Sequence, residues 1–287
     1  MRITTAFLLS MGAHIAVFLV LALLAAIDAW HYRISWSLAF GEATRDLINL
    51  GAAQMLGVLM MIALGWRFFA PRQTLPAALR LERIPPLWLI ASLIYGVALQ
   101  FSLSELENWL RELWPMDAAR AKAMQALLNP QTSIEWLGIL LTIPILAPIS
   151  EEIFFRGWLF PRLSAAYRWR TATLTTAFLF ALHHVEYVAM VYAFIAGILF
   201  ALIFHWTRSL FTTLTMHIAF NATPLLLNKH TLPIKGFNLF HQQVQHMDWA
   251  IPMGATLVVA ALTYWFYGMR PEQLCPTDAS RAPHQES

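Results

Sequence analysis

Eight apolar stretches follow one another along the 287-residue chain, and each is close to the length of a membrane-crossing helix. About 20 predominantly apolar residues in a helix cross about 30 Å of hydrocarbon. Only 12% of the residues are charged, whereas soluble domains have about 25%. We therefore expect an all-α polytopic membrane protein with about eight transmembrane helices. The predicted spans are residues 5–29, 47–69, 85–103, 137–162, 171–186, 187–206, 209–227 and 249–268.

The basic residues indicate how the chain is oriented in the membrane. They lie between the apolar stretches and do not cluster with interleaved aromatic residues along a soluble domain, so nucleic acid is not an expected partner. Cytoplasmic loops of membrane proteins carry an excess of Lys and Arg. With a cytoplasmic N-terminus, twelve of these residues lie inside and seven lie outside. This difference favours a multi-pass protein of the cell (inner) membrane with both termini in the cytoplasm.

Polar segments divide the chain further. Residues 104–133 carry acidic residues and tryptophans at helical spacing, which suits either an amphipathic helix on the outer interface or a connecting loop. The single cysteine, Cys275, rules out an internal disulfide framework and a cysteine-based zinc cage. We expect N-terminal helices with the amphipathic outer segment (1–133), a core containing the buried charges (134–227), an outer loop with the last helix (228–270) and a disordered cytoplasmic tail (271–287).

Three ionisable side chains, Glu151, Glu152 and Arg156, occur within six residues of the fourth apolar stretch. At membrane depth each costs at least about 2.5 kcal/mol, so such groups usually face the protein interior and have a function. Glu152 and Arg156 are i,i+4 neighbours that can pair, whereas Glu151 projects about 100° away. The pair alone could be structural, but Glu151 has no second cation within a helical turn. Pro144 and Pro148 loosen the preceding turn and could open a polar pocket there.

Two histidines on later spans complete the candidate site. His184 lies at the end of the fifth span, and His217, four residues before Asn221, lies in the seventh. Counted at 1.5 Å per residue from the nearest inner arginine, Glu151, His184 and His217 lie about 16, 21 and 14 Å from the inner surface. The three groups can meet only if the fourth helix continues past Arg156.

The order of these residues resembles the CAAX protease and bacteriocin-processing (CPBP) family, also called ABI or Rce1-like intramembrane proteases. Its pattern is EExxxR, then FxxxH, then HxxxN or HxxxD, each on a separate membrane helix. The resemblance covers about residues 134–227 and implies a glutamic-type intramembrane endopeptidase. The doublet with His183 leaves open which ring matches FxxxH. The matching residues are Glu151, Glu152 and Arg156, then Phe180 and His184, then His217 and Asn221.

These residues suggest how a peptide bond could be hydrolysed. We expect Glu151 to be the general base, with His184 holding the same water. His217 and Asn221 would donate hydrogen bonds to the developing oxyanion. The i,i+4 ion pair would fix the helix and could steer the substrate.

A metal-dependent route would use the same atoms. Glu151, His184 and His217 would leave one open position on a zinc ion. The usual H-E-x-x-H run is missing from the chain. We favour the metal-independent glutamate mechanism with no cofactor, which the family resemblance also suggests, although the residues themselves leave both routes open.

The expected substrate is a membrane-associated protein or peptide, cut near the cytoplasmic half of the bilayer. Short loops and compact size are typical of bacterial proteins, for which a prenylated substrate is not expected. A proton-coupled transporter is one alternative, but it predicts broken helices in both halves of the chain, and polar clusters occur only in residues 151–221. The other alternative is a catalytically silent family member acting as an immunity or scaffold protein, although every motif position is retained.

Overall fold

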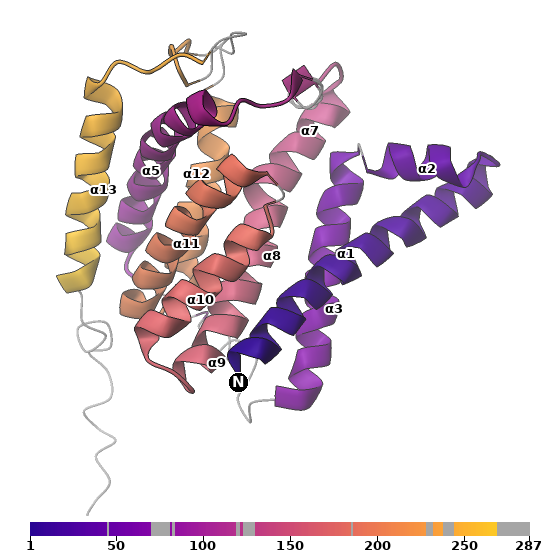
Figure 1. Ribbon diagram of the computed structural model, residues 1–287, viewed down its shortest axis with the longest axis horizontal. Helices are drawn as coiled ribbons and strands as arrows, with labels where there is room; N and C mark the ends of the chain where they lie inside the picture. Colours follow the sequence, from indigo (N-terminus) through magenta and orange to yellow (C-terminus); the bar gives the residue numbers. More distant parts are fainter. Residues whose placement is uncertain are drawn as a thin grey trace, which may run out of the picture.

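The computed structural model consists of helices and connecting segments, and no β-strand occurs among the residues it describes (Figure 1). This confirms the predicted all-α class. The polar tail predicted for residues 271–287 lies outside the described part. The structure describes residues 1–44, 46–69, 81, 84–118, 121–122, 130–184, 186–227, 232–237 and 244–268.

Each of the eight predicted spans corresponds to a helix or to a continuous run of helical segments. Six of them, within the described ranges, are long and apolar enough to cross a membrane, and the chain is a multi-pass membrane protein. The other two, α10 and α12, have 14 and 17 residues. The elements are α1 (Ile3–Tyr32), α2 (Trp36–Ala43), α3 (Leu47–Phe69), α5 (Pro86–Leu113), α7 (Ser133–Leu141), η1 (Thr142–Leu146), α8 (Ala147–Glu152), η2 (Ile153–Leu159), α9 (Phe160–Ser164), α10 (Trp169–Leu182), α11 (Tyr187–Thr207), α12 (Leu210–Leu226) and α13 (Ala250–Gly268).

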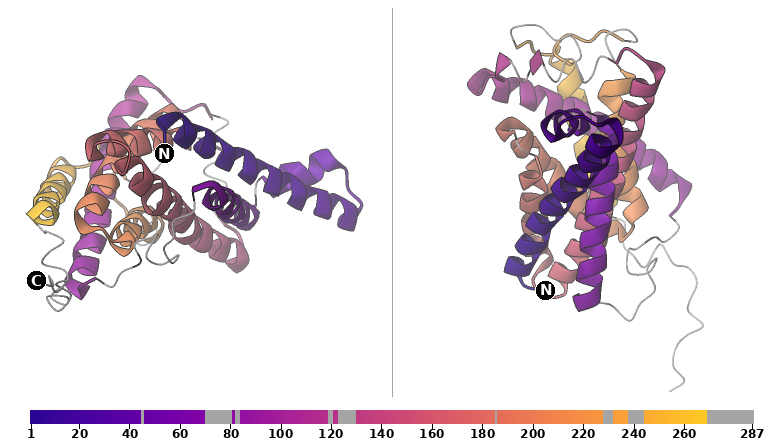
Figure 2. Two further views of the ribbon diagram at one scale, coloured as in Figure 1. Left: turned by 90° about the horizontal axis from the view of Figure 1, so that it is seen from below. Right: turned by 90° about the vertical axis from the view of Figure 1, so that its right-hand side faces the viewer.

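The helices form two groups on either side of the segment from α7 to α9 (Figures 1 and 2). On one side α1 packs against α3 and α2. On the other side α12 packs against α5 and α11, α10 packs against α11, and α13 lies at the outer edge against α5. A buried cluster around Phe154 and Trp158 contacts the first group, and a second cluster contains Tyr95, Phe200 and Phe266. The α7–α9 segment therefore runs through the middle of the molecule.

This central segment is continuous but irregular. It runs from Ser133 to Ser164, and both η1 and η2 within it are π-helical. Pro144 and Pro148 have no amide hydrogen, and a proline ring crowds the carbonyl one turn earlier, which accounts for a widened turn at η1. The predicted continuation of the helix past Arg156 is confirmed. Such π-helical turns occur frequently at functional sites.

The helix α5 is longer than predicted. The sequence placed the end of the third span at residue 103 and left residues 104–133 as either an interfacial helix or a loop. Instead α5 continues to Leu113 as one helix. Its charges are paired, because Arg111 binds Glu186 at the start of α11 through two contacts of 2.8 Å and also binds Glu107 at 3.1 Å. Because these charges are paired, the last turns of α5 can pack within the helix bundle.

The close packing of α5 against α12 generates a stability prediction. A Cβ atom at Gly96 would overlap the carbonyl oxygen of Met216 and would lie 2.8 Å from the Cβ atom of Ala219. Gly96→Ala should therefore lower the free energy of unfolding by about 1–3 kcal/mol, as overpacking usually does. The measurement is thermal unfolding in detergent. Gly254→Ala on α13 is the matched control, because a Cβ atom there has no neighbour within 4 Å. An unchanged unfolding temperature for Gly96→Ala would contradict this account of the α5–α12 contact.

The segment before α13 is attached to the end of α5. His246 contacts Glu105 through Nδ1 at 2.7 Å and Glu112 through Nε2 at 3.1 Å. The amide of Met247 also donates to Glu105 at 3.1 Å, and Asn108 donates to the carbonyl oxygen of Gly236 at 2.7 Å. The hydrogen bond with Glu112, followed by that with Glu105, raises the pKa of His246 above its usual value.

This attachment should depend on pH. Because the pKa of His246 is raised in the folded state, its contribution to stability is complete below about pH 6.5 and is lost as the pH rises through the higher folded value. His246→Ala should therefore cost more stability at pH 6 than at pH 9, by less than about 1 kcal/mol because the side chain is partly exposed to solvent. Thermal unfolding of both proteins at the two pH values measures the difference. An equal cost at both pH values would show that the histidine charge contributes nothing.

Candidate active site

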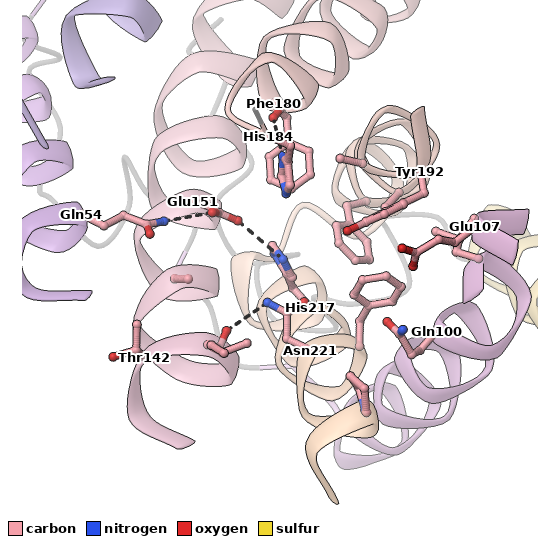
Figure 3. Close-up of a pocket in the computed structure, with 18 of the residues that line it drawn as sticks. Gln54, Gln100, Glu107, Thr142, Glu151, Phe180, His184, Tyr192, His217 and Asn221 are labelled. Atoms are coloured by element: carbon pink, nitrogen blue, oxygen red, sulfur yellow. Dashed lines mark hydrogen bonds and ion pairs between the residues drawn. The ribbon is translucent and has the colours of Figure 1, made fainter. Parts of the chain in front are cut away.

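A cavity of about 480 Å³ lies between the two groups of helices (Figure 3). Four of the six residues selected from the sequence line it: Glu151 from α8, His184 just after α10, and His217 and Asn221 from α12. The other two, Glu152 and Arg156, are buried behind its wall. The structure thus brings together an acid and two imidazoles from segments that are far apart in the chain.

The two oxygens of Glu151 have different surroundings. Oε1 accepts a hydrogen bond of 2.9 Å from the side-chain amide of Gln54 on α3. Oε2 lies 3.6 Å from Nε2 of His217 (Figure 3). The carboxylate is therefore held on one side and directed at the imidazole on the other.

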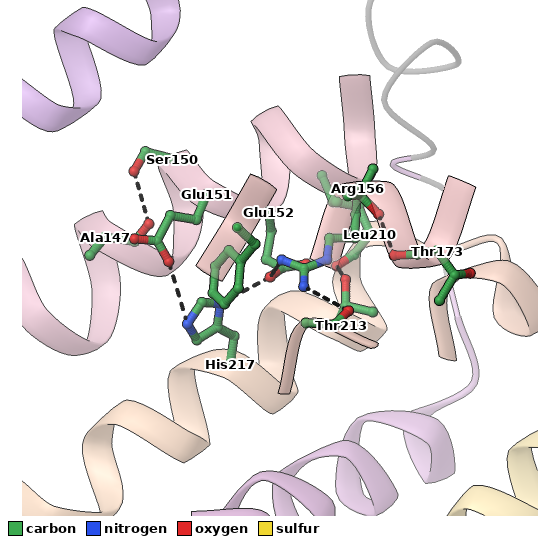
Figure 4. A network of polar contacts seen from close by, with 12 residues as sticks. Ala147, Ser150, Glu151, Glu152, Arg156, Thr173, Leu210, Thr213 and His217 are labelled. Atoms are coloured by element: carbon green, nitrogen blue, oxygen red, sulfur yellow. Dashed lines mark hydrogen bonds and ion pairs between the residues drawn. The ribbon is translucent and has the colours of Figure 1, made fainter. Parts of the chain in front are cut away.

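Two buried charged side chains hold the His217 ring in one orientation through its Nδ1 atom (Figure 4). Arg156 binds Oε1 of Glu152 at 2.6 Å, and the same oxygen lies 2.9 Å from Nδ1 of His217. Because an ionised carboxylate only accepts hydrogen bonds, Nδ1–H of the imidazole is the donor. This contact leaves Nε2 of His217 as the ring atom that faces Glu151.

The guanidinium of Arg156 has several partners within the bundle, although its buried Nε has no hydrogen-bond partner. The side chains of Arg156 and Glu152 are 1% and 0% exposed. The guanidinium also donates to the carbonyl oxygen of Gly197 at 3.3 Å, and it lies over the rings of Phe180 and Phe200 at 4.7 and 5.4 Å. Aromatic faces attract cations most strongly where water is excluded. The pair therefore connects the central segment with α10 and α11.

The structure distinguishes the two neighbouring histidines. Nδ1 of His184 lies 3.2 Å from the carbonyl oxygen of Phe180, one turn earlier, and the ring lines the main cavity. His183 instead contacts Ser10 on α1 through Nε2 at 2.9 Å, and its ring centre is 3.6 Å from that of His14. It lines a second cavity of about 270 Å³ on the other side of Glu151. His184 is thus the ring that shares a cavity with His217.

Asn221 connects α12 with the irregular turn of the central segment. Its amide donates to the carbonyl oxygen of Ile143 in η1 at 3.0 Å. A side-chain amide carries two hydrogens, so one remains for a second acceptor. The residue lines the same cavity as Glu151 and His217.

The family comparison agrees with this arrangement. Residues 133–223 match the family model described as "Type II CAAX prenyl endopeptidase Rce1-like". This segment, about a third of the chain, is similar to the Rce1-like family. At the level of the family this match supports a CAAX-type intramembrane protease, and the matched segment contains all six residues selected from the sequence. No curated protein and no solved structure matches the chain.

Several cavity-lining side chains were not selected from the sequence, and they lie outside the Rce1-like segment. Gln54 on α3 contacts Glu151 directly, and Gln100, Ser104 and Glu107 on α5 form a polar wall opposite (Figure 3). An amide inside the second apolar stretch was the available signal for Gln54, because an unpaired polar group is costly there. Gln100 gave the same signal inside the third predicted span, whereas Ser104 and Glu107 lie beyond the predicted end of that span at residue 103.

The candidate zinc ligands named from the sequence are not grouped as a metal site. Within the described ranges, no three His, Cys, Asp or Glu side chains lie close enough together to hold a metal ion. Glu151, His184 and His217 therefore do not form a three-ligand group as they are placed. A zinc-dependent route would require these side chains to move toward one another.

The buried ion pair generates a prediction that separates its structural role from its orienting role. Arg156→Leu alone should lower the free energy of unfolding by about 3–5 kcal/mol, because Glu152 then remains buried without its cation. Adding Glu152→Leu should restore most of this loss, since an apolar pair of similar volume is often as stable as a buried ion pair. The measurements are thermal unfolding in detergent and, for the double variant, proteolysis.

The double variant should nevertheless stay inactive. It removes the acceptor for Nδ1 of His217, so the ring is no longer held in one orientation. Normal proteolysis by a stable double variant would show that the pair only supports the fold.

Proposed function

We propose that this protein is an intramembrane endopeptidase that hydrolyses a peptide bond of a membrane-associated protein or peptide with a water activated by Glu151. The observation that carries the proposal is the 3.6 Å approach of Glu151 Oε2 to His217 Nε2 at the wall of a cavity that His184 also lines. A direct hydrogen bond is shorter than this. A water oxygen beside the pair can therefore contact both groups.

In this mechanism Glu151 accepts the proton of the attacking water. Its Oε1 is held by Gln54, so Oε2 is the atom available as the base. His184 donates Nδ1–H to the carbonyl oxygen of Phe180, which leaves Nε2 to accept a hydrogen bond from the same water. A general base of this kind contributes about 100- to 10,000-fold in rate, and the proton passes on to the leaving amine.

The oxyanion would be stabilised from α12. Protonated His217 donates Nε2–H, and the second amide hydrogen of Asn221 is the other donor. Glu152 accepts Nδ1–H of His217 and stabilises the imidazolium, as the buried carboxylate does in a serine protease triad. Arg156 keeps Glu152 ionised through its 2.6 Å contact. No cofactor takes part in these steps.

Substitutions at the cavity should separate catalysis from folding. Glu151→Gln should abolish proteolysis, because the isosteric amide cannot accept the proton. His217→Gln and Asn221→Leu should each lower the rate about 100- to 1000-fold, as the loss of one oxyanion donor does. The readout is the mass-spectrometric detection of membrane-protein termini that appear in cells expressing the wild-type protein and not the Glu151→Gln variant.

His183→Gln is the matched control, because this ring lies in the second cavity. It should produce the same new termini as the wild-type protein. Proteolysis that persists in all three cavity variants would overturn the proposal. Purified enzyme should also remain active after treatment with a chelator, and inhibition that zinc reverses would favour the metal-dependent route.

A further inference from the structure

One charged side chain in the main cavity has no part in the proposed chemistry. Glu107 on α5 lines the cavity together with the catalytic candidates. Figure 3 shows its carboxylate directed into the cavity from the wall opposite Glu151. The side chain of Glu107 is 35% exposed, compared with 14% for Glu151. This carboxylate is therefore open to whatever occupies the cavity.

The protein itself uses only one oxygen of this carboxylate. Oε1 of Glu107 accepts hydrogen bonds from Nε and Nη2 of Arg111 at 3.3 and 3.1 Å, whereas Oε2 has no hydrogen-bond partner among the residues that the structure describes. On the same wall, the amide of Gln100 donates to the hydroxyl of Ser104 at 2.9 Å, so these neutral neighbours are paired with each other. Oε2 of Glu107 is the charged acceptor that remains for a ligand.

The positive charge of Arg111 is already bound by a second acid. Its Nη1 and Nη2 atoms each lie 2.8 Å from a different oxygen of Glu186, and such bidentate pairs are the strong ones. This pair joins α5 to the start of α11 without Glu107. Two carboxylates share one guanidinium, which leaves one negative charge uncompensated in the group.

No other part of the cavity wall balances this charge. Neither Lys nor Arg occurs among the described residues that line the cavity. On the catalytic side the charges cancel, because Glu152 is paired with Arg156 and Glu151 faces His217, which is protonated in the proposed mechanism. The cavity is therefore electronegative at its α5 wall.

We propose that Glu107 forms a subsite for a cationic side chain, so that the cavity selects polypeptides with a lysine or arginine near the scissile bond. Opposite charges attract more strongly where the protein replaces water, and the N–H groups of either side chain can donate to Oε2. The charge preference of the cavity does not depend on catalysis, whereas the position relative to a scissile bond rests on the proposed proteolytic function.

The size of the cavity limits how far the cation lies from the bond that is cut. A sphere with the cavity volume of about 480 Å³ is about 10 Å across, and an extended chain covers that distance in about three residues. Glu107 and Glu151 line opposite walls of this space. We therefore expect the lysine or arginine within about three residues of the scissile bond.

Peptide binding tests the charge preference without any requirement for proteolysis. The probes are three fluorescent apolar pentapeptide amides that differ only at the central residue, which is lysine, glutamine or glutamate. The full-length Glu151→Gln protein in detergent should bind the lysine peptide about tenfold more tightly than the glutamine peptide, as one hydrogen bond between charged groups provides. The glutamate peptide should bind most weakly. Adding Glu107→Gln should remove the preference, and adding Glu107→Asp, which keeps the charge, should retain it.

Glu105→Gln is the matched control, because this acid lies two residues earlier on α5 and contacts His246 instead of the cavity. It should leave the preference for the lysine peptide unchanged. A lysine peptide that binds no better than the glutamine peptide, or a preference that survives Glu107→Gln, would overturn the subsite. An equal loss of preference in Glu105→Gln would also overturn it, because the effect would then come from the acidity of the whole helix end.

The new membrane-protein termini test the same subsite during proteolysis. Termini that depend on Glu151 should have a lysine or arginine within about three residues. For a peptide copied from such a terminus, Glu107→Gln should raise KM about tenfold and leave kcat nearly unchanged. Termini without these residues would overturn the subsite and leave the protease assignment standing. If no terminus depends on Glu151, the proposed proteolysis fails, and the peptide affinities still decide the subsite.

Discussion

The buried pair of Glu152 and Arg156 is the interaction on which the rest of this structure depends. Removing two charges from water costs several kcal/mol for each ion, and their attraction compensates only when the remaining hydrogen-bonding atoms also find partners. Here the guanidinium reaches Gly197 and two aromatic rings, and the carboxylate reaches His217. Only Nε of Arg156 and Oε2 of Glu152 are left without a hydrogen-bond partner among the buried atoms of this pair. Four helical segments are thereby held in one arrangement, and the imidazole of the site is held with them.

The irregular central helix determines where the other catalytic candidates point. In η1 the widened turn presents the carbonyl oxygen of Ile143 to Asn221, and the regular turns of α8 follow directly with Glu151 and Glu152 on different sides. One acid faces the cavity and the other faces the buried cation. The two adjacent carboxylates therefore have different surroundings although they are neighbours in sequence.

The sequence predicted local features well and distant partners poorly. Each of the eight apolar runs corresponds to a helix or a run of helical segments, and i,i+4 spacing predicted the contact between Glu152 and Arg156. The end of α5 was misplaced because its charged residues have distant partners, such as Glu186, which is 75 residues away from Arg111. The contacts of Glu151 with Gln54 and of Glu152 with His217 likewise join residues 97 and 65 positions apart. No local pattern encodes such pairs.

The shortness of α10 has a consequence for the surrounding lipid. Its 14 residues rise about 21 Å, which is about 9 Å less than an average hydrocarbon core. Leu174 and Phe178 on this helix are more than half exposed, so α10 contacts acyl chains. Bilayers respond to such hydrophobic mismatch by thinning locally. Headgroups and water then approach the end of α10, and the path from the aqueous phase to His184 becomes shorter than elsewhere around the bundle.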